Sequence, residues 1–228
     1  MIEGIVLDLD DTLYLERDFV RSGFRRVAEF VERVGVIDAD TAFAHLWEGF
    51  GGGRRGDAFD SLSSRYSLDG RTSVTELVHL YRSHRPDIRI LEPQALDALA
   101  RSGIPLAMIS DGQLATQSAK IDALDVRDLF SVVVLTGEWG HDFWKPHPRA
   151  FEVVETELGL GGGQLAYVAD NPMKDFIAPN RRGWLSVRLR TSGQLHYHLE
   201  AVDDSAAPSL EVPSLHAVVD MVSIDSPR

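Results

Sequence analysis

The sequence predicts an α/β fold: a parallel β-sheet with helices on both faces and a small all-helical segment inserted after the first strand. Two observations predict it. Short, continuous apolar runs recur along the chain and alternate with segments of helical periodicity, which is typical of parallel strands buried on both faces. Between the first and second of these runs, residues 16–90 show helical periodicity alone.

The first strand is the run Ile5-Val6-Leu7, and the helical segment follows it. Ser73 and Glu76 have the spacing of a capping box, which marks the start of the last helix of this segment. Earlier in the segment, apolar residues recur at helical spacing over three stretches, 19–34, 41–50 and 57–66.

The charge distribution separates the helical segment from the rest of the chain. Twelve arginines balance twelve acidic residues between Glu16 and Arg89, so the net charge of −12 lies outside this segment. This break in composition indicates a separate module. We therefore expect a catalytic core formed by residues 1–15 and 91–228, and a helical cap domain formed by residues 16–90.

From Pro93 onward, helices and strands alternate, which predicts a sheet of about five strands when the first strand is included. Beyond Arg190 the pattern is less regular, with one helix expected over 215–221. The expected elements in between are helix 94–101, strand 106–109, helix 114–124, strand 132–135, helix 148–158, strand 165–168, helix 176–181 and strand 185–188.

Composition excludes several classes of function. The chain has no cysteine, which excludes disulfides and thiolate chemistry. No apolar run approaches the ~20 residues that cross a bilayer, and we see no signal peptide. The net charge of −12 disfavours a nucleic acid or an anionic membrane as a partner. We expect a cytoplasmic protein, monomeric or homodimeric, that acts on a small molecule.

Acidic residues gather where the first strand ends. Asp8 and Asp10 are two positions apart, so on a strand they point the same way, and the hydroxyl of Thr12 follows. Carboxylates this close are unfavourable unless a cation lies between them or one holds a proton. A D-x-D pair alone is also compatible with a solvated acidic turn, so the interpretation depends on its distant partners.

Polar residues also follow the later strands, and the carboxyl ends of parallel strands meet at one edge of the sheet. Ser110-Asp111-Gly112 opens a helix whose backbone N–H groups can hold an anion, and Lys145 follows the third strand. Asp170 follows the fourth strand, and Asp175 lies about one helical turn later. This set is suited to phosphoryl transfer, because a phosphate needs positive charge around its oxygens.

In this interpretation Asp8 is the in-line nucleophile and Asp10 first protonates the leaving oxygen and then activates water. Mg²⁺ prefers oxygen ligands, which Asp8, Asp170 and the backbone at Asp10 offer.

The order D-x-D-x-T, S-D-G, K-P-x-P and D-N-P-x-x-D resembles the haloacid dehalogenase superfamily of aspartate-nucleophile phosphatases. The resemblance implies a Rossmann-like core with a helical cap inserted after the first strand. It implies Asp8 as nucleophile, Asp10 as general acid/base, and Asp170 with Asp175 at a Mg²⁺ site. The implied substrate contacts are Thr12, Ser110, Asp111, Gly112 and Lys145.

Asp10 also separates subclasses of this superfamily, because members that cleave carbon–halogen bonds lack an aspartate there. Asp111 departs from the pattern, since Asn is common at that position, and it adds negative charge beside the expected phosphate site. Lys174 is expected to be solvated.

We therefore expect a Mg²⁺-dependent phosphatase acting on a sugar phosphate or a nucleoside monophosphate. A phosphomutase of the same fold, a receiver-type signalling domain and a non-catalytic phosphate-binding relative are the alternatives.

Overall fold

The computed structural model describes residues 1–224, and its contacts divide the chain into two compact units. One unit is formed by Met1–Arg17 together with the chain from Arg89 onward, and the other by Asp18–Ile88. The second unit occupies nearly the segment expected to be a cap, 16–90. That it acts as a cap stays a prediction.

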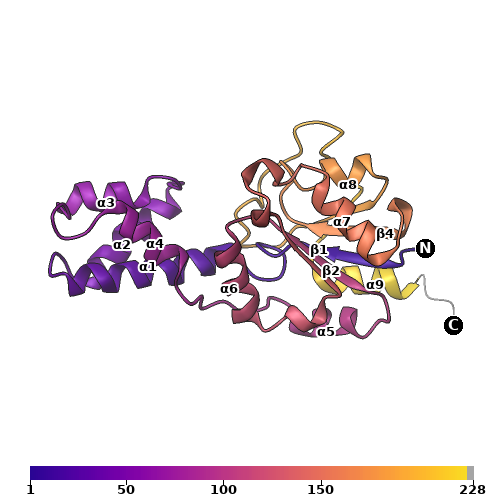
Figure 1. Ribbon diagram of the computed structural model, residues 1–228, viewed down its shortest axis with the longest axis horizontal. Coiled ribbons are helices and arrows are strands. Elements are labelled where there is room, and N and C mark those ends of the chain that lie inside the picture. Colours follow the sequence, from indigo (N-terminus) through magenta and orange to yellow (C-terminus); the bar gives the residue numbers. More distant parts are fainter. Residues whose placement is uncertain (225–228) are drawn as a thin grey trace. The chain divides into compact units, whose positions relative to one another are not determined.

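The larger unit is built on a parallel sheet of six strands in the order β3-β2-β1-β4-β5-β6 (Figure 1). β1 lies in the centre, with Val6 opposite Ala107 of β2 on one side and Tyr167 of β4 on the other. The carboxyl ends of these three strands are therefore neighbours. The strands are β1 (Gly4–Leu7), β2 (Leu106–Ser110), β3 (Val132–Leu135), β4 (Leu165–Ala169), β5 (Leu185–Leu189) and β6 (Leu210–Val212).

Helices cover both faces of the sheet. Figure 1 shows α7 and α8 on one face, and α5, α6 and α9 on the other, where α5 and α9 pack together. The helices are α5 (Pro93–Ala100), α6 (Leu114–Leu124), α7 (Arg149–Leu158), α8 (Ile177–Arg181) and α9 (Leu215–Ile224). Apolar side chains from β1, β2, β4 and α7 form a buried core between the α7 face and the sheet.

The α/β fold with its parallel sheet is confirmed, and the five expected strands are present. The sixth strand, β6, was not expected. It has three residues, of which Leu210 and Glu211 are exposed, so it carries no apolar run of the kind that identified the other strands.

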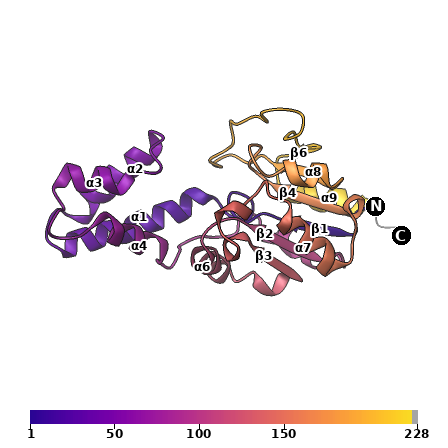
Figure 2. The ribbon, with the colours of Figure 1, turned by 45° about the horizontal axis from the view of Figure 1, so that its top comes forward.

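The smaller unit is entirely helical in Figures 1 and 2. Its interior is aromatic, with Phe24 in edge contacts with Phe50 and Phe59. Ser73 begins its last helix by accepting a hydrogen bond from the backbone of Glu76, so the predicted helix start is confirmed; the Glu76 carboxylate accepts from Thr72 Oγ1 and does not complete the predicted capping box. Its helices are α1 (Glu16–Arg33, which starts in the larger unit), α2 (Ala39–Gly51), α3 (Ala58–Tyr66) and α4 (Val74–Arg82).

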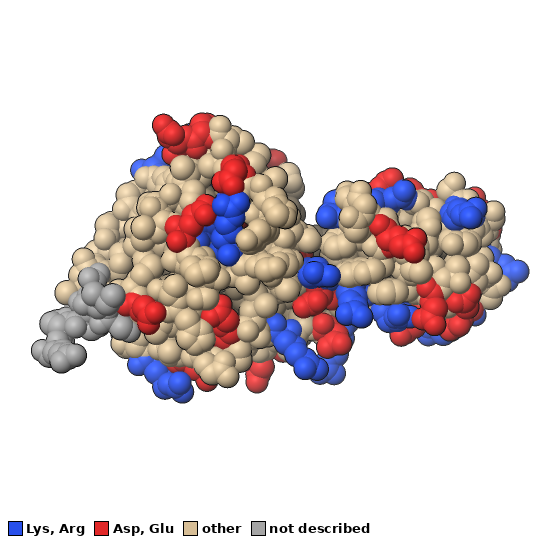
Figure 3. Space-filling view, turned by 180° about the vertical axis from the view of Figure 1, so that it is seen from behind, with Lys and Arg blue, Asp and Glu red and all other residues tan. Residues whose placement is uncertain are grey.

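The apolar character of the helices and the distribution of surface charge are relevant to membrane and nucleic-acid binding. Within residues 1–224, none of the helices is both long enough and apolar enough to span a bilayer. The face drawn in Figure 3 carries acidic and basic side chains side by side, without a continuous basic patch among the residues described.

Candidate active site

Three buried carboxylates meet at the carboxyl ends of β1 and β4. Asp8 directly follows β1, and its backbone N–H donates to Val168 of β4, which holds the two strand ends together. Asp170 follows β4, and Asp175 is fixed by the hydrogen bond that its Oδ2 accepts from the backbone of Asn171. One oxygen from each of these three aspartates lies within 4.8 Å of the others. The structure thus brings together Asp8, Asp170 and Asp175, as the sequence predicted.

Lys145 joins two of these carboxylates. Its Nζ lies 2.8 Å from Asp8 Oδ1 and 2.8 Å from Asp175 Oδ1, and it donates a 2.9 Å hydrogen bond to Tyr167 Oη. The side chain has no exposed surface. Burial alone would lower the pKa of Lys145, but the charges of Asp175 and Asp8 raise it well above the ordinary value. The two carboxylates therefore favour the charged form of Lys145.

The carboxylates of this cluster carry more negative charge than one ammonium can offset. Burial raises the pKa of Asp8 to about 8 against the effect of Lys145, and the charge of Asp175 raises it further. Burial also raises the pKa of Asp170, against a hydrogen bond from His196. A divalent cation that takes oxygen ligands would relieve this repulsion, so the residues present fit Mg²⁺.

Asp10 belongs to a different cluster. Its Oδ1 is 2.7 Å from Lys120 Nζ and accepts a hydrogen bond from Tyr14, while its Oδ2 accepts a 2.8 Å hydrogen bond from Gln117. Burial raises the pKa of Asp10, but the charge of Lys120 together with the hydrogen bonds from Lys120, Tyr14 and Gln117 outweighs burial, and the pKa is lowered. Because this carboxylate is engaged elsewhere, any contribution of Asp10 to a cation site would come from its backbone, as the sequence analysis expected.

Three further predicted contacts lie at the end of β2 and in the turns after β1 and β2. Ser110 is buried, and its Oγ accepts a 2.6 Å hydrogen bond from Gln117. The hydroxyl of Thr12 is buried and has no hydrogen-bond partner within residues 1–224. Gly112 has a φ of 136°, and a Cβ there would lie 3.0 Å from the side chain of Gln117, so this turn requires glycine.

Asp111 does not leave an uncompensated charge beside the expected phosphate site. Its Oδ1 accepts hydrogen bonds from Thr136 Oγ1 (2.8 Å) and the backbone of Lys145 (3.1 Å), and its Oδ2 pairs with Lys174 at 2.8 Å. Burial would raise its pKa, but Lys145 and Lys174 lower it. Lys174, expected to be a solvated residue and not a ligand contact, is only partly solvated: 34% of its side chain is exposed, and its ammonium pairs with Asp111.

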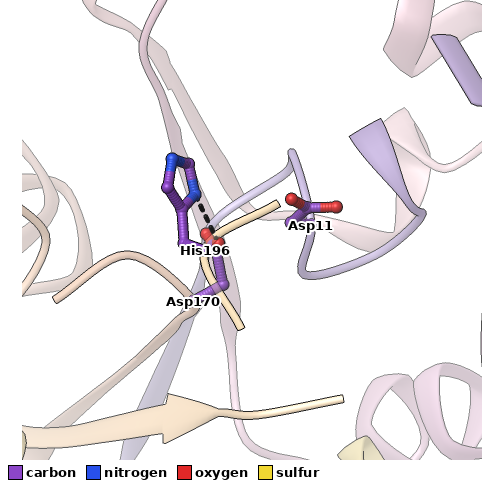
Figure 4. Close-up of side chains that lie close together, drawn as sticks. All are labelled: Asp11, Asp170 and His196. Carbon is purple, nitrogen blue, oxygen red and sulfur yellow. Dashed lines mark hydrogen bonds and ion pairs between the residues drawn. The ribbon is translucent and has the colours of Figure 1, made fainter. Parts of the chain in front are cut away.

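A third group of side chains was not expected. In Figure 4 the ring of His196 lies against Asp170, at 2.9 Å from Nδ1 to Oδ2, and Asp11 lies near both. Asp11 has a left-handed φ of 53° and accepts hydrogen bonds from the backbones of Glu16 and Leu195. It therefore ties the turn after β1 to the segment after β5.

Sequence reasoning missed His196 because it lies in a segment without helical or strand periodicity. It missed Gln117 and Lys120 because they lie within α6, where polar residues are common and their sequence positions do not indicate a functional contact. One signal for His196 was available: it follows the fifth strand, β5, as the other site residues follow theirs.

The chain is similar to known proteins in both sequence and fold. The sequence model of the haloacid dehalogenase-like hydrolases matches residues 2–181. The chain is 28% identical to a glyceraldehyde 3-phosphate phosphatase of Methanocaldococcus jannaschii and 26% identical to one of Methanopyrus kandleri, over 97% of each protein. Its fold is similar to that of a haloacid dehalogenase-superfamily hydrolase from Geobacter sulfurreducens, with a TM-score of 0.68 and 15% identity over 97% of this chain and 96% of that one.

Proposed function

The chain belongs to the haloacid dehalogenase-like hydrolases, and we propose that it is a Mg²⁺-dependent phosphatase that hydrolyses small phosphate monoesters through an aspartyl-phosphate on Asp8. One observation carries this proposal. Asp8 lies in the cluster with Lys145, Asp170 and Asp175, whereas Asp10 lies in a separate cluster with Lys120. In the first cluster Lys145 offers positive charge and Asp170 and Asp175 offer cation ligands beside Asp8, where a phosphoryl group would be held, whereas Asp10 lies outside that cluster.

The reaction has two steps. Asp10 enters the first step carrying the proton that it took from water in the previous turnover. A carboxylate oxygen of Asp8 attacks phosphorus, the ester P–O bond breaks, and Asp10 gives that proton to the departing oxygen. Asp10 then removes a proton from water as the water attacks phosphorus, which releases inorganic phosphate and restores Asp8. Lys145 offers fixed positive charge beside Asp8 throughout, where charge develops on the phosphoryl oxygens.

Asp8, Asp170 and Asp175, with the backbone of Asp10, would hold Mg²⁺, which when bound neutralises charge on the phosphate. Ser110 at the end of β2, Gly112 in the turn after it and Thr12 in the turn after β1 would contact the phosphate. In this proposal Asp111 acts by fixing Lys174 and the backbone of Lys145 instead of touching the substrate.

The substrate belongs to the small phosphorylated metabolites, and sugar phosphates come first among them. Support comes from the relatives that match nearly the whole chain, which are named glyceraldehyde 3-phosphate phosphatases. Asp10 favours ester cleavage over carbon–halogen cleavage, because only a departing alkoxide needs a proton. The enzyme would act without a nucleic-acid or membrane partner.

The test is inorganic phosphate release from a panel of triose phosphates, larger sugar phosphates and nucleoside monophosphates, with Mg²⁺ and with EDTA. We expect Mg²⁺-dependent release that is greatest for the sugar phosphates and absent with Asp8→Asn. Halide release from a 2-haloacid is measured in parallel. Halide release without phosphate release, or phosphate release that EDTA does not affect, contradicts the proposal. A phosphomutase would return the phosphoryl group to an organic acceptor in place of free phosphate.

A further inference from the structure

Lys120 is one of only three lysines in the chain, against twenty arginines, and it is buried next to Asp10. Its side chain is 5% exposed, and Nζ lies 2.7 Å from Asp10 Oδ1. Lys120 lies outside all four sequence motifs, and no step of the proposed reaction uses it. A buried ammonium is costly unless it is paired, so its placement needs a reason.

The first turns of α6 present two donors to Asp10 on one face. Gln117 and Lys120 are three residues apart and therefore point the same way from the helix. Gln117 donates to Asp10 Oδ2, and Lys120 donates to Oδ1, which also accepts a hydrogen bond from Tyr14. Both oxygens of Asp10 are thus held by side chains from two segments of the larger unit.

This arrangement contributes to orientation more than to stability. Burying an ion pair gives little net stabilisation, because the two charges lose their hydration. The three donors Lys120, Gln117 and Tyr14 instead hold the Asp10 carboxylate in a single orientation. In general acid/base catalysis the group must lie within hydrogen-bond reach of the proton that it moves, so orientation affects the rate directly.

We propose that Lys120 is a positioning residue: it holds the carboxylate of Asp10 in the orientation from which Asp10 transfers protons, without itself touching the substrate. The inference rests on the proposed function, in which Asp10 is the general acid/base. It adds a residue of α6 to the machinery formed by the strand ends.

A residue that acts only through Asp10 has a distinctive kinetic effect. With 4-nitrophenyl phosphate the nitrophenolate leaves without needing a proton, so the first step proceeds without Asp10. The second step still needs Asp10 to activate water. Loss of Lys120 should therefore leave the first step fast and slow the second, so that one equivalent of nitrophenolate appears as a burst before slow turnover.

The experiment compares Lys120→Met, Asp10→Asn and the double variant by rapid-mixing and steady-state kinetics with Mg²⁺. We expect Lys120→Met to lower kcat on the order of 10²-fold and to produce a burst, as Asp10→Asn does. The double variant should be no slower than Asp10→Asn, because Lys120 has nothing left to orient. Lys120→Arg keeps a cationic donor and should recover part of the lost rate.

The matched control is Asp122→Asn, which removes a charge at an exposed position of the same helix and should leave both phases unchanged. Circular dichroism establishes that each variant is folded. Should Lys120→Met not fold, Lys120→Arg and the double variant still supply the comparison.

The outcomes separate the two claims. A wild-type enzyme that turns over no phosphate ester overturns the proposed function, and this inference with it. If the wild-type enzyme turns over, two results overturn the role of Lys120 alone. One is that the rate losses of the single variants multiply in the double variant. The other is that Lys120→Met slows both steps equally.

Discussion

The two units of this protein bury polar groups very differently. In the helical unit, residues 18–88, the described side chains that are both buried and polar are Ser63 and His84. In the larger unit the buried polar side chains include charged ones, and most lie where a strand ends or in α6. They are Asp8, Asp11, Thr12, Ser110, Asp111, Gln117, Lys120, Thr136, Lys145, Asp170, Asn171, Asp175, Ser186, Arg188 and Gln194.

From this difference we expect the larger unit to carry the chemistry and the helical unit to depend on apolar packing. The interior of the helical unit consists of apolar and aromatic contacts such as those of Phe24 with Phe50 and Phe59, which stabilise by burial alone. The larger unit keeps acidic and basic groups out of water, which costs free energy unless they are paired. Substitutions in the two units should therefore have different consequences for activity and for stability.

The largest expected effect on activity comes from Asp8→Asn. We expect kcat to fall on the order of 10⁴-fold or more, because the nucleophile is removed. We expect the Tm in EDTA not to fall, because burial raises the pKa of the Asp8 carboxyl and the folded state gains little from its charge. Activity assays and thermal unfolding of the same preparation measure both effects.

Wild-type protein in EDTA and in Mg²⁺ provides the control for this prediction. Mg²⁺ should raise the Tm of the wild type and have less effect on the Asp8→Asn variant, which lacks one ligand. A variant that loses activity and stability together would show that Asp8 is a structural residue.

Lys145→Met should affect both activity and stability. It removes the positive charge beside Asp8, which we expect to cost at least ~10²-fold in kcat. It also leaves Asp8 and Asp175 buried without their common partner, at a cost of about 3–5 kcal/mol in the free energy of unfolding. Urea unfolding and steady-state kinetics test it. Unchanged stability would mean that the buried carboxylates do not depend on this ammonium.

Leu62→Ala tests the helical unit. Leu62 is fully buried in α3, so its truncation should lower the free energy of unfolding by about 2–5 kcal/mol through lost burial and a cavity. The affinity for Mn²⁺, used as a probe of the cation site, should not change, because every proposed ligand lies in the other unit. Calorimetric titration measures this affinity. A weakened site would show that the division between the two units is not a functional one.

The smallest expected effect is that of Asp111→Asn, and it depends on pH. The folded protein lowers the pKa of Asp111, so its stabilising contribution is present above the unfolded value of ~4 and is lost as the pH falls through the folded value. The variant should be about 1 kcal/mol less stable than the wild type at pH 7, and the difference should vanish in acid. Urea unfolding across this range measures the difference, with Asp122→Asn as the exposed control. A difference independent of pH would contradict the ion pair with Lys174.

Much of the larger unit was predictable because its strands are buried on both faces and appear as continuous apolar runs. The same runs located Asp8, Asp170 and Lys145, since the chemistry of an open parallel sheet lies beyond the strand ends. Gln117 and Lys120 were not predictable in this way. Their role depends on how α6 packs beside the turn after β1, and helical periodicity does not specify that contact.

His196 illustrates a second limit. It reaches Asp170 from a segment after β5 that has no regular structure, and it is held there by the hydrogen bonds of Asp11 with Leu195 and of Gln194 with the Asp11 backbone. These contacts join residues more than 180 positions apart in the sequence. Local sequence patterns carry no signal for contacts of that kind.

Trapping the phosphorylated aspartate is the decisive measurement. The Asp10→Asn variant is mixed with Mg²⁺ and 4-nitrophenyl phosphate, quenched, and treated with borohydride, which reduces an acyl phosphate to an alcohol. Peptide mass spectrometry then locates the reduced residue. We predict that it is Asp8 and that its amount matches the nitrophenolate burst. A burst with no modification of Asp8, or with the modification at another residue, would contradict the assignment of Asp8 as the nucleophile.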